Sequence, residues 1–243
     1  MLFRSAEAAA AEPVAPLSAP HPRAGFAGEQ SARRVIKAIG INVAEDALAG
    51  SAEEAAARAR NFGGRVALKI ASPDIAHKSD MGGVALGLAD EAAVRAAFAR
   101  IMDNAKKNAP QARIDGVMVS PMVEGGVETI VGVTRDPVFG PMVMFGLGGV
   151  FVEIAKDNVL RRAPVSRDDA LAMVRSIKAF ALLDGARGRP RMDIEALAEA
   201  ISRLSAWANQ YADEFAGVEI NPLIVLPRGQ GVIAVDALIS PLS

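Results

Sequence analysis

Lys69 is the residue of this sequence that folding alone explains least well, because it lies inside the apolar stretch 66–71. A short apolar run with β-branched residues is typical of a strand, and a lysine is seldom fully buried without a partner. Its ammonium group therefore either reaches solvent at the end of the strand or points into a cleft towards an anionic ligand. The residues around Lys69 leave both possibilities open.

A polar loop with two adjacent glycines follows this stretch. It contains His77, Lys78, Ser79, Asp80, Met81, Gly82 and Gly83. A glycine pair lets the backbone approach a ligand closely and can direct amides at a phosphate, but it is also common in turns. The spacing matches neither the P-loop nor the dinucleotide-binding fingerprint. A second glycine-rich segment, 145–150, indicates either a flexible loop or a tight bend between strands.

Oxygen-bearing side chains cluster near the C-terminus. Glu219 and Asn221 belong to one predicted strand, and Asp236 lies on the next strand of a predicted hairpin whose turn is 227–231. Asn221 and Asp236 would face each other across this hairpin. Sparse oxygen ligation of this kind suits Mg²⁺, which retains water and phosphate ligands. The alternative is a turn at the end of a strand with an aspartate on the surface.

The pattern along the chain predicts interspersed helices and strands. Helices are expected from Glu29 to a stop at Gly40, from a capping box of Ser51 and Glu54 to residues 62–64, from Asp90 to about Asn108, from a cap of Ser166 and Asp169 to about Phe180, and from Asp193 to Asn209. Strands are expected at 66–71, 81–88, 114–120, 127–133, 142–145, 159–163, 218–225 and 232–238. Because hairpin-like pairs recur without strict alternation, we expect an α+β fold with antiparallel sheets.

Composition excludes several classes of function. The 27 basic and 28 acidic residues give a net charge of -1, which does not favour generic binding of nucleic acid or anionic membranes. The absence of cysteine excludes thiol nucleophiles and cysteine-ligated metals, and two histidines are too few for a histidine-rich metal site. The apolar runs are too short to span a membrane, so we expect a cytoplasmic protein. We also expect a flexible Ala/Pro-rich tail over 1–28 and a folded domain over 29–243, divided into two lobes near 110–125.

Four segments together resemble one family. They are VALKIASPDIAHKSDMGGV, VETIVGVTRDPVFGPMVMFGLGG, VLRRAPVS and GVEINPLIV, and they resemble the ATP-grasp domain of NDP-forming acyl-CoA synthetases, the family of ADP-forming acetate–CoA ligase. The resemblance extends from about Glu29 to Leu238. It implies an ATP-grasp fold, with two lobes enclosing a nucleotide cleft, and the cofactors ATP or ADP and Mg²⁺.

The resemblance also implies a role for each matching residue. Lys69 matches a lysine that contacts phosphates, and Gly82 and Gly83 match a loop that folds over them. His77 matches a histidine that relays phosphate, and Arg161 matches a basic position near the transferred group. The remaining matches are a linker that reads adenine (Ser120, Pro121, Met122 and Val123), a ribose-binding acid (Glu128), and Mg²⁺ ligands (Asn221 and Asp236, with Glu219 as a neighbour).

The implied activity is Mg²⁺-dependent phosphoryl transfer between ATP or ADP and a phosphohistidine on a partner. Acid, CoA and ATP would give acyl-CoA, ADP and phosphate overall. Since 243 residues leave no room for the CoA-binding and phosphohistidine domains, a partner α subunit is expected to supply them and to bind the small carboxylic acid. Two alternatives remain: a nucleotide-binding regulatory or structural subunit without turnover, and a free-standing carboxylate–amine ligase.

Overall fold

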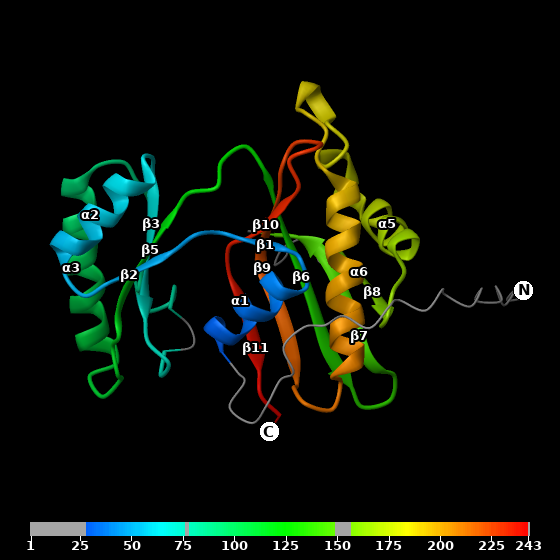
Figure 1. The fold of residues 1–243 in the computed structure, drawn as a ribbon, viewed down its shortest axis with the longest axis horizontal. Coiled ribbons are helices and arrows are strands. Elements are labelled where there is room, and N and C mark those ends of the chain that lie inside the picture. Colours follow the sequence, from blue (N-terminus) through cyan, green and yellow to red (C-terminus); the bar gives the residue numbers. More distant parts are fainter. Residues whose placement is uncertain (1–27, 76–77, 149–156, 243) are drawn as a thin grey trace, which may run out of the picture. The chain divides into compact units, whose positions relative to one another are not determined.

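The computed structural model describes residues 28–75, 78–148 and 157–242. The chain forms two compact units, whose elements are shown in Figure 1. The small unit is Ala44–Glu124, and the large unit combines the residues up to Val43 with those from Gly125 onward. Each unit has its own sheet and its own apolar core.

The large unit is built on a seven-stranded mixed sheet. Its strands are β1 (Asn42–Val43), β6 (Val127–Asp136), β7 (Gly140–Leu147), β8 (Asn158–Arg162), β9 (Gly217–Val225), β10 (Val232–Ala234) and β11 (Ala237–Ser240). They lie in the order β1-β10-β9-β6-β7-β8, and β11 also pairs with β9. β1 runs parallel to β10, whereas the other pairs are antiparallel.

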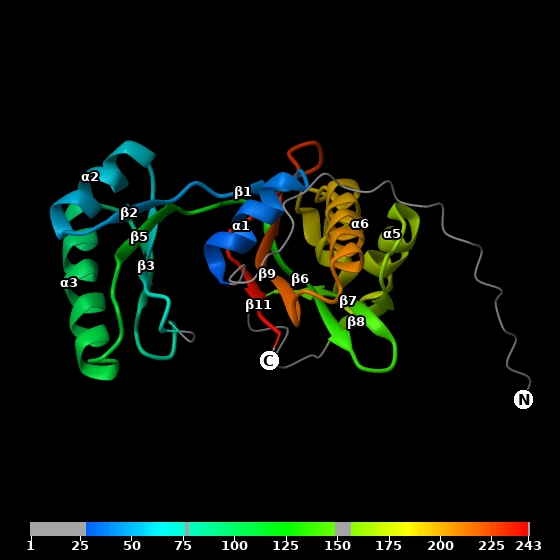
Figure 2. The ribbon, with the colours of Figure 1, turned by 60° about the horizontal axis from the view of Figure 1, so that its bottom comes forward.

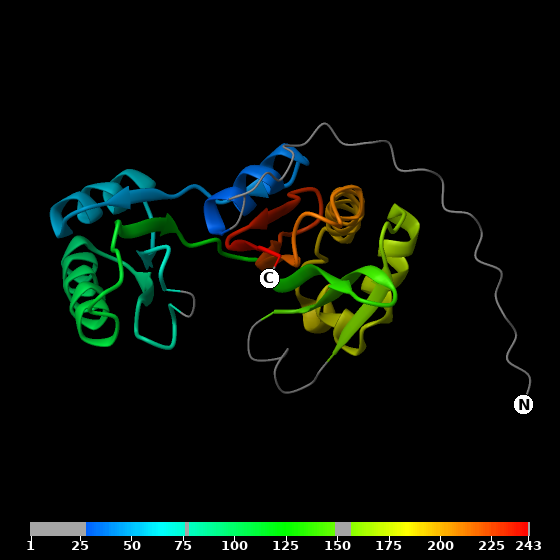
Figure 3. The ribbon, with the colours of Figure 1, turned by 90° about the horizontal axis from the view of Figure 1, so that it is seen from below.

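Helices α1 (Glu29–Ala38), α5 (Arg167–Ser176) and α6 (Ile194–Gln210) pack on one face of this sheet, as Figures 2 and 3 show. Alternate strand residues point towards the helices, and Val131, Val143 and Ile220 are therefore fully buried. The intervening residues point to the opposite face, which we call the outer face of the large sheet. They include Glu128, Gly132, Met142, Met144, Leu160 and Glu219.

The small unit has a four-stranded antiparallel sheet in the order β2-β5-β3-β4. Its strands are β2 (Ala47–Ala49), β3 (Val66–Ala71), β4 (Val84–Leu88) and β5 (Gly116–Pro121). Helices α2 (Ala52–Phe62) and α3 (Glu91–Asn108) cover one face. Under them Val66, Leu68 and Ile70 are fully buried, so the residues between these three belong to the outer face of the small sheet.

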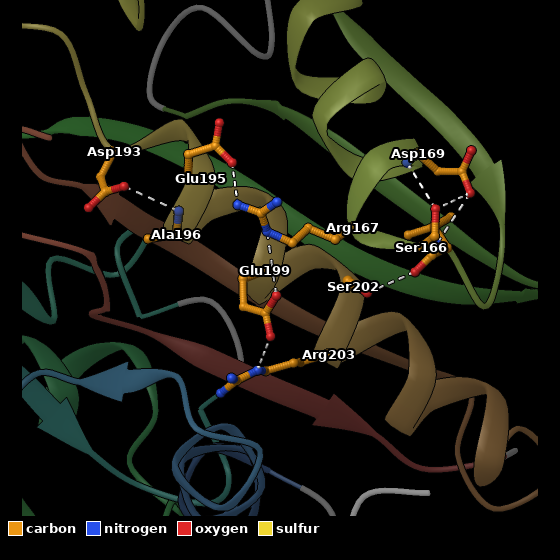
Figure 4. Close-up of polar contacts among 10 residues, drawn as sticks. Ser166, Arg167, Asp169, Asp193, Glu195, Ala196, Glu199, Ser202 and Arg203 are labelled. Carbon is orange, nitrogen blue, oxygen red and sulfur yellow. Dashed lines mark hydrogen bonds and ion pairs between the residues drawn. The ribbon is translucent and has the colours of Figure 1, made fainter. Parts of the chain in front are cut away.

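Helix starts follow the sequence closely. The predicted capping box of Ser166 and Asp169 is present at the start of α5 (Figure 4). Ser51 caps α2 by accepting a hydrogen bond from the Glu54 N–H, but the Glu54 carboxylate accepts from the Gly50 N–H at 2.8 Å. The second capping box is therefore only half formed.

The predicted extension of α5 to Phe180 is wrong. α5 ends at Ser176, because Ile177 adopts an extended conformation, and the 3₁₀ helices η1 (Lys178–Leu182) and η2 (Ala186–Gly188) follow. Asp157 fixes the start of η1, since its carboxylate accepts hydrogen bonds from the N–H groups of Lys178 and Ala179 at 2.9 and 2.8 Å.

The predicted strand 232–238 is interrupted at Val235 and Asp236. β10 and β11 both pair with β9, on either side of Asn221 and Pro222. Proline has no N–H to donate to a ladder, and the pairing of β9 with β6 also shifts register at this point. The interruption sits where the candidate metal ligands lie.

An ion-pair network ties α5 to α6, as Figure 4 shows. Arg167 of α5 pairs with Glu195 and Glu199 of α6, and Glu199 accepts a hydrogen bond from Arg203 at 2.7 Å. Arg203 also donates to the carbonyls of Ile39 and Gly40, which follow α1, at 3.3 Å. These contacts link the three helices that cover the large sheet.

Asp193 joins the start of α6 to the β9–β10 turn. Its carboxylate accepts hydrogen bonds from the N–H groups of Gly229 and Gly231, both at 2.9 Å, and from that of Ala196 at 3.2 Å. Asp193→Ala is expected to lower the free energy of unfolding by about 2 kcal/mol, because three backbone donors lose their acceptor. Urea denaturation measures this change.

Asp213→Ala is the matched control for this variant. Asp213 is exposed and pairs with Arg135 at the surface, where such pairs contribute little. Equal losses of stability in the two variants would show that Asp193 has no special role in joining the two elements.

Candidate functional site

Lys69 lies on the outer face of the small sheet. It pairs in register with Met118 of β5 on one side and Val84 of β4 on the other. Leu48 of β2 extends the row beyond Met118. The lysine is half-buried in this row of apolar side chains, which provides a partly desolvated cation on a sheet surface, suited to an anionic ligand.

The loop before β4 is a tightly bonded turn. The Gly82 N–H donates to the Ser79 carbonyl at 3.0 Å, and the Gly83 N–H donates to the Lys78 carbonyl at 2.8 Å. Asn104 of α3 donates to the Gly82 carbonyl at 3.0 Å. In this structure the amides of the glycine pair are committed to the loop itself, so the predicted strand 81–88 begins only at Val84.

The segment predicted to read adenine lies at the end of β5. Ser120 and Pro121 are still paired with β3, and the Met122 N–H donates to the Arg65 carbonyl at 2.8 Å. The Arg65 guanidinium donates to the Glu124 carboxylate at 2.8 and 3.0 Å. The two neighbours of Val123, Met122 and Glu124, are thus both bonded to Arg65, the residue before β3.

The candidate metal ligands come together in the large unit. The Asn221 side-chain amide donates to the Glu219 carboxylate at 3.0 Å, and the Asn221 N–H donates to the Asp236 carbonyl at 2.9 Å. One oxygen of the Asp236 carboxylate accepts from the Ala237 N–H at 3.0 Å. The exposed side chains of Glu219 and Asn221 therefore touch and offer carboxylate and amide oxygens of the kind that Mg²⁺ binds, and Asp236 is joined to Asn221 through the backbone.

Two further predicted residues lie elsewhere on the large sheet. Glu128 is exposed on the outer face, opposite Ile224 of β9. Arg161 pairs in register with Val143, a residue of the helix-covered face, and its neighbour Arg162 pairs with Met142 on the outer face. Outer-face residues of the large unit therefore include Glu128 and Glu219 but not Arg161.

Some predicted residues lie outside the described part of the chain. They are His77, Gly149 and Val150, together with residues 1–27 of the predicted tail. Conversely, the sequence analysis did not single out Met118, the register partner of Lys69. Strand alternation alone could have placed Met118 on an outer face, but only the pairing of β3 with β5 shows that it lies beside the lysine.

A surface hollow of about 380 Å³ lies in the small unit, between the end of α2 and the start of α3. Arg60 and Glu91 line it and form a salt bridge at 2.7 Å. Hydrogen bonds from Arg60 and Arg95 hold the pKa of the Glu91 carboxyl at about 2. The hollow contains none of the residues predicted to bind nucleotide. No helix within the described ranges has the length and apolar character needed to cross a membrane.

The two sheets with their covering helices form an ATP-grasp fold. Residues 20–240 match the ATP-grasp domain family. The chain therefore belongs to this family, within the group of ADP-forming acetate–CoA ligase β subunits, which confirms both the predicted fold and the resemblance.

Two relatives, one of them seen in two structures, support this assignment. The chain is 44% identical over 209 residues to the acetate–CoA ligase [ADP-forming] I subunit beta of Pyrococcus furiosus, covering 86% of this chain and 89% of that one. The dinucleotide-forming acetyl-coenzyme A synthetase 1 of Ca. Korarchaeum cryptofilum, in complex with coenzyme A and Ca-AMPCP, is 44% identical with a TM-score of 0.81, covering 88% and 93%. Another structure of that synthetase contains Mg-AMPPCP, with its phosphohistidine segment pointing towards the nucleotide site (41% identity, TM-score 0.72, coverage 88% and 92%).

Proposed function

We propose that the chain is the ATP-grasp subunit of an ADP-forming acyl-CoA synthetase. It catalyses Mg²⁺-dependent phosphoryl transfer between ATP or ADP and a phosphohistidine of a partner subunit. The overall reaction converts a carboxylic acid, CoA and ATP into acyl-CoA, ADP and phosphate. A carboxylate is a poor electrophile, whereas an acyl phosphate has a leaving group that a thiol can displace, so phosphoryl transfer makes the acid reactive.

The observation that carries the proposal is the pair of outer sheet faces. One bears Lys69 among apolar neighbours, and the other bears Glu219 beside Asn221 and Asp236. Phosphoryl transfer requires positioning and neutralisation of charge, and each sheet, taken by itself, offers residues of a type that this chemistry uses. The relatives with bound nucleotide analogues belong to the same family.

Each residue then has a proposed role. Lys69 neutralises the α- and β-phosphates. The segment Ser120–Val123 contacts the adenine through backbone groups and the Met122 side chain, and Glu128 binds the ribose. The loop containing Gly82 and Gly83 covers the phosphates, and it does so through its side chains, because both glycine amides already donate to loop carbonyls.

Asn221, Asp236 and Glu219 hold the Mg²⁺, which when bound offsets the negative charge of the phosphates. These residues offer oxygen atoms and no nitrogen ligand, in keeping with the preference of Mg²⁺. His77 is proposed to relay the phosphoryl group towards the partner's histidine, because an imidazole nitrogen can act as a nucleophile.

The partner subunit supplies the phosphohistidine and the CoA-binding site, and it binds the small carboxylic acid. The Pyrococcus furiosus relative is itself named as a β subunit, which supports an assembly of two kinds of chain. Selection of the acid belongs to the partner in this proposal.

Calorimetric titration of the isolated chain with Mg-ATP and Mg-ADP tests the proposal. Wild type should bind both, and Lys69→Met should weaken binding roughly 10- to 100-fold, because a charge-assisted contact with the phosphates is lost. Lys107→Met, at an exposed position of α3 in the same unit, is the matched control. If wild type binds no nucleotide, or both variants bind equally well, the assignment is wrong.

A further inference from the structure

Two consecutive arginines on β8 project from opposite faces of the large sheet. β8 pairs with β7 so that Arg161 lies opposite Val143 and Arg162 lies opposite Met142. Successive side chains of a strand alternate between faces, and register partners share a face. The two guanidinium groups therefore lie on different faces of the sheet.

Burial identifies the two surfaces. Val143 is fully buried in the core that includes α5 and α6, whereas Met142 is only half-buried on the outer face. Arg162 is therefore the arginine on the face that carries the candidate metal ligand Glu219.

A row of register partners connects this face across five strands. It runs from Leu238 of β11 through Glu219, Gly132 and Met144 to Leu160 of β8. Arg162 stands two residues beyond Leu160, in the adjacent row, with Met142, Thr134 and Gly217. Each row contains one glycine, Gly132 or Gly217, and Met144 and Met142 lie between these glycines and β8.

The separation suits a bridging anion. β8 and β9 are separated by β7 and β6, so three strand spacings place their backbones about 14 Å apart. At this separation a long glutamate and a long arginine on the same face can both reach a group that lies above the two intervening strands. A cation held at Glu219 and Asn221 on one side and a guanidinium on the other would neutralise a phosphoryl group from two directions. Arginine suits this task because its planar fork matches phosphate oxygens and is always charged.

We propose that Arg162, rather than Arg161, binds the phosphoryl group that the enzyme transfers. The inference rests on the proposed function and adds a residue to it. The same group is carried by ATP before transfer and by the partner's histidine afterwards, so Arg162 contacts it in either state. During transfer the bond from the γ-phosphorus to the β–γ bridging oxygen breaks, a bond to the imidazole nitrogen forms, and ADP leaves with the bridging oxygen. Arg162 stabilises the charge on the phosphoryl oxygens and forms no covalent bond.

Three variants with the same change in side chain test the proposal: Arg162→Gln, Arg161→Gln and Arg175→Gln. Arg175 lies at the exposed end of α5 and serves as the control for loss of one positive charge. The first measurement is calorimetric affinity of the isolated chain for Mg-ADP and for a non-hydrolysable Mg-ATP analogue. The second is the rate of phosphoryl transfer to Mg-ADP from the phosphorylated partner subunit in the assembled complex.

Arg162→Gln is expected to lose roughly tenfold or more in affinity for the ATP analogue, or in the transfer rate, with ADP affinity within threefold of wild type. A loss with the ATP analogue identifies the nucleotide as the source of the bound phosphoryl group. A loss confined to transfer identifies the phosphorylated partner. Arg161→Gln should have the smaller effect in both measurements.

The proposal is overturned if Arg161→Gln causes the larger loss, or if Arg162→Gln behaves like Arg175→Gln in both measurements while wild type binds nucleotide. Absence of nucleotide binding by wild type overturns the proposed function as well. Circular dichroism checks that each variant folds. If Arg162→Gln does not fold, Arg162→Lys replaces it as the test, because lysine keeps the positive charge but lacks the planar guanidinium. If Arg162 contacts the phosphoryl oxygens, Arg162→Lys should bind the ATP analogue more weakly or transfer the phosphoryl group more slowly.

Discussion

The isolated chain is expected to form no acyl-CoA from acetate, CoA and ATP, and the same mixture should turn over once the partner α subunit is added. In the proposed function the residues of this chain bind a nucleotide and a metal and move a phosphoryl group, which activates the acid only when a second site receives that group. The Pyrococcus furiosus relative is named as a β subunit. Detection of acetyl-CoA by mass spectrometry, with each chain purified separately, measures the effect.

The control for this experiment is the partner alone, which should also be inactive because it lacks the nucleotide site. Acetyl-CoA formation by this chain alone, with no peptide of a partner detectable in the preparation, would contradict the proposal that a partner subunit supplies the phosphohistidine and the CoA-binding site. It would instead favour a free-standing ligase.

Asp236→Asn is expected to remove the Mg²⁺ dependence of nucleotide binding and to slow phosphoryl transfer in the complex by at least about 100-fold. The variant removes the negative charge but keeps the hydrogen bond, because an asparagine oxygen can still accept from the Ala237 N–H as Asp236 does. The fold around the break between β10 and β11 should therefore persist. Titration with ADP in Mg²⁺ and in EDTA measures the dependence.

Asp168→Asn is the matched control, since Asp168 is exposed in the first turn of α5 and lies on the helix side of the large sheet. It should bind nucleotide as wild type does. If Asp236→Asn retains the full difference between Mg²⁺ and EDTA, Asp236 is not a metal ligand, and the donor set of Asn221 and Glu219 must be reconsidered.

Local sequence signals predicted most of the helices and strands correctly. Caps at Ser51, Asp90 and Asp193 marked helix starts because a short polar side chain before an apolar run satisfies backbone N–H groups. The α+β class with antiparallel pairing also followed from short-range patterns, and the resemblance supplied the ATP-grasp fold, which is confirmed.

What the sequence did not predict depends on contacts between distant segments. Whether Arg161 or Arg162 faces the outer surface depends on the register of β8 against β7, because a shift of one residue exchanges the two faces. The break at Val235 and Asp236 depends on which strand lies opposite Pro222. The commitment of the Gly82 and Gly83 amides to loop carbonyls depends in the same way on the folded loop.

The sequence order of the two units has a consequence for synthesis on the ribosome. The small unit is one continuous segment, so all of its strands are synthesised before residue 125 is added. In the large unit, β1 pairs with β10 and α1 packs on β11, which are among the last elements to be synthesised. The small unit can therefore fold first. Val35 and Ile36 of α1, which are buried in the folded protein, have no β11 to pack against until nearly all of the remaining polypeptide has been synthesised.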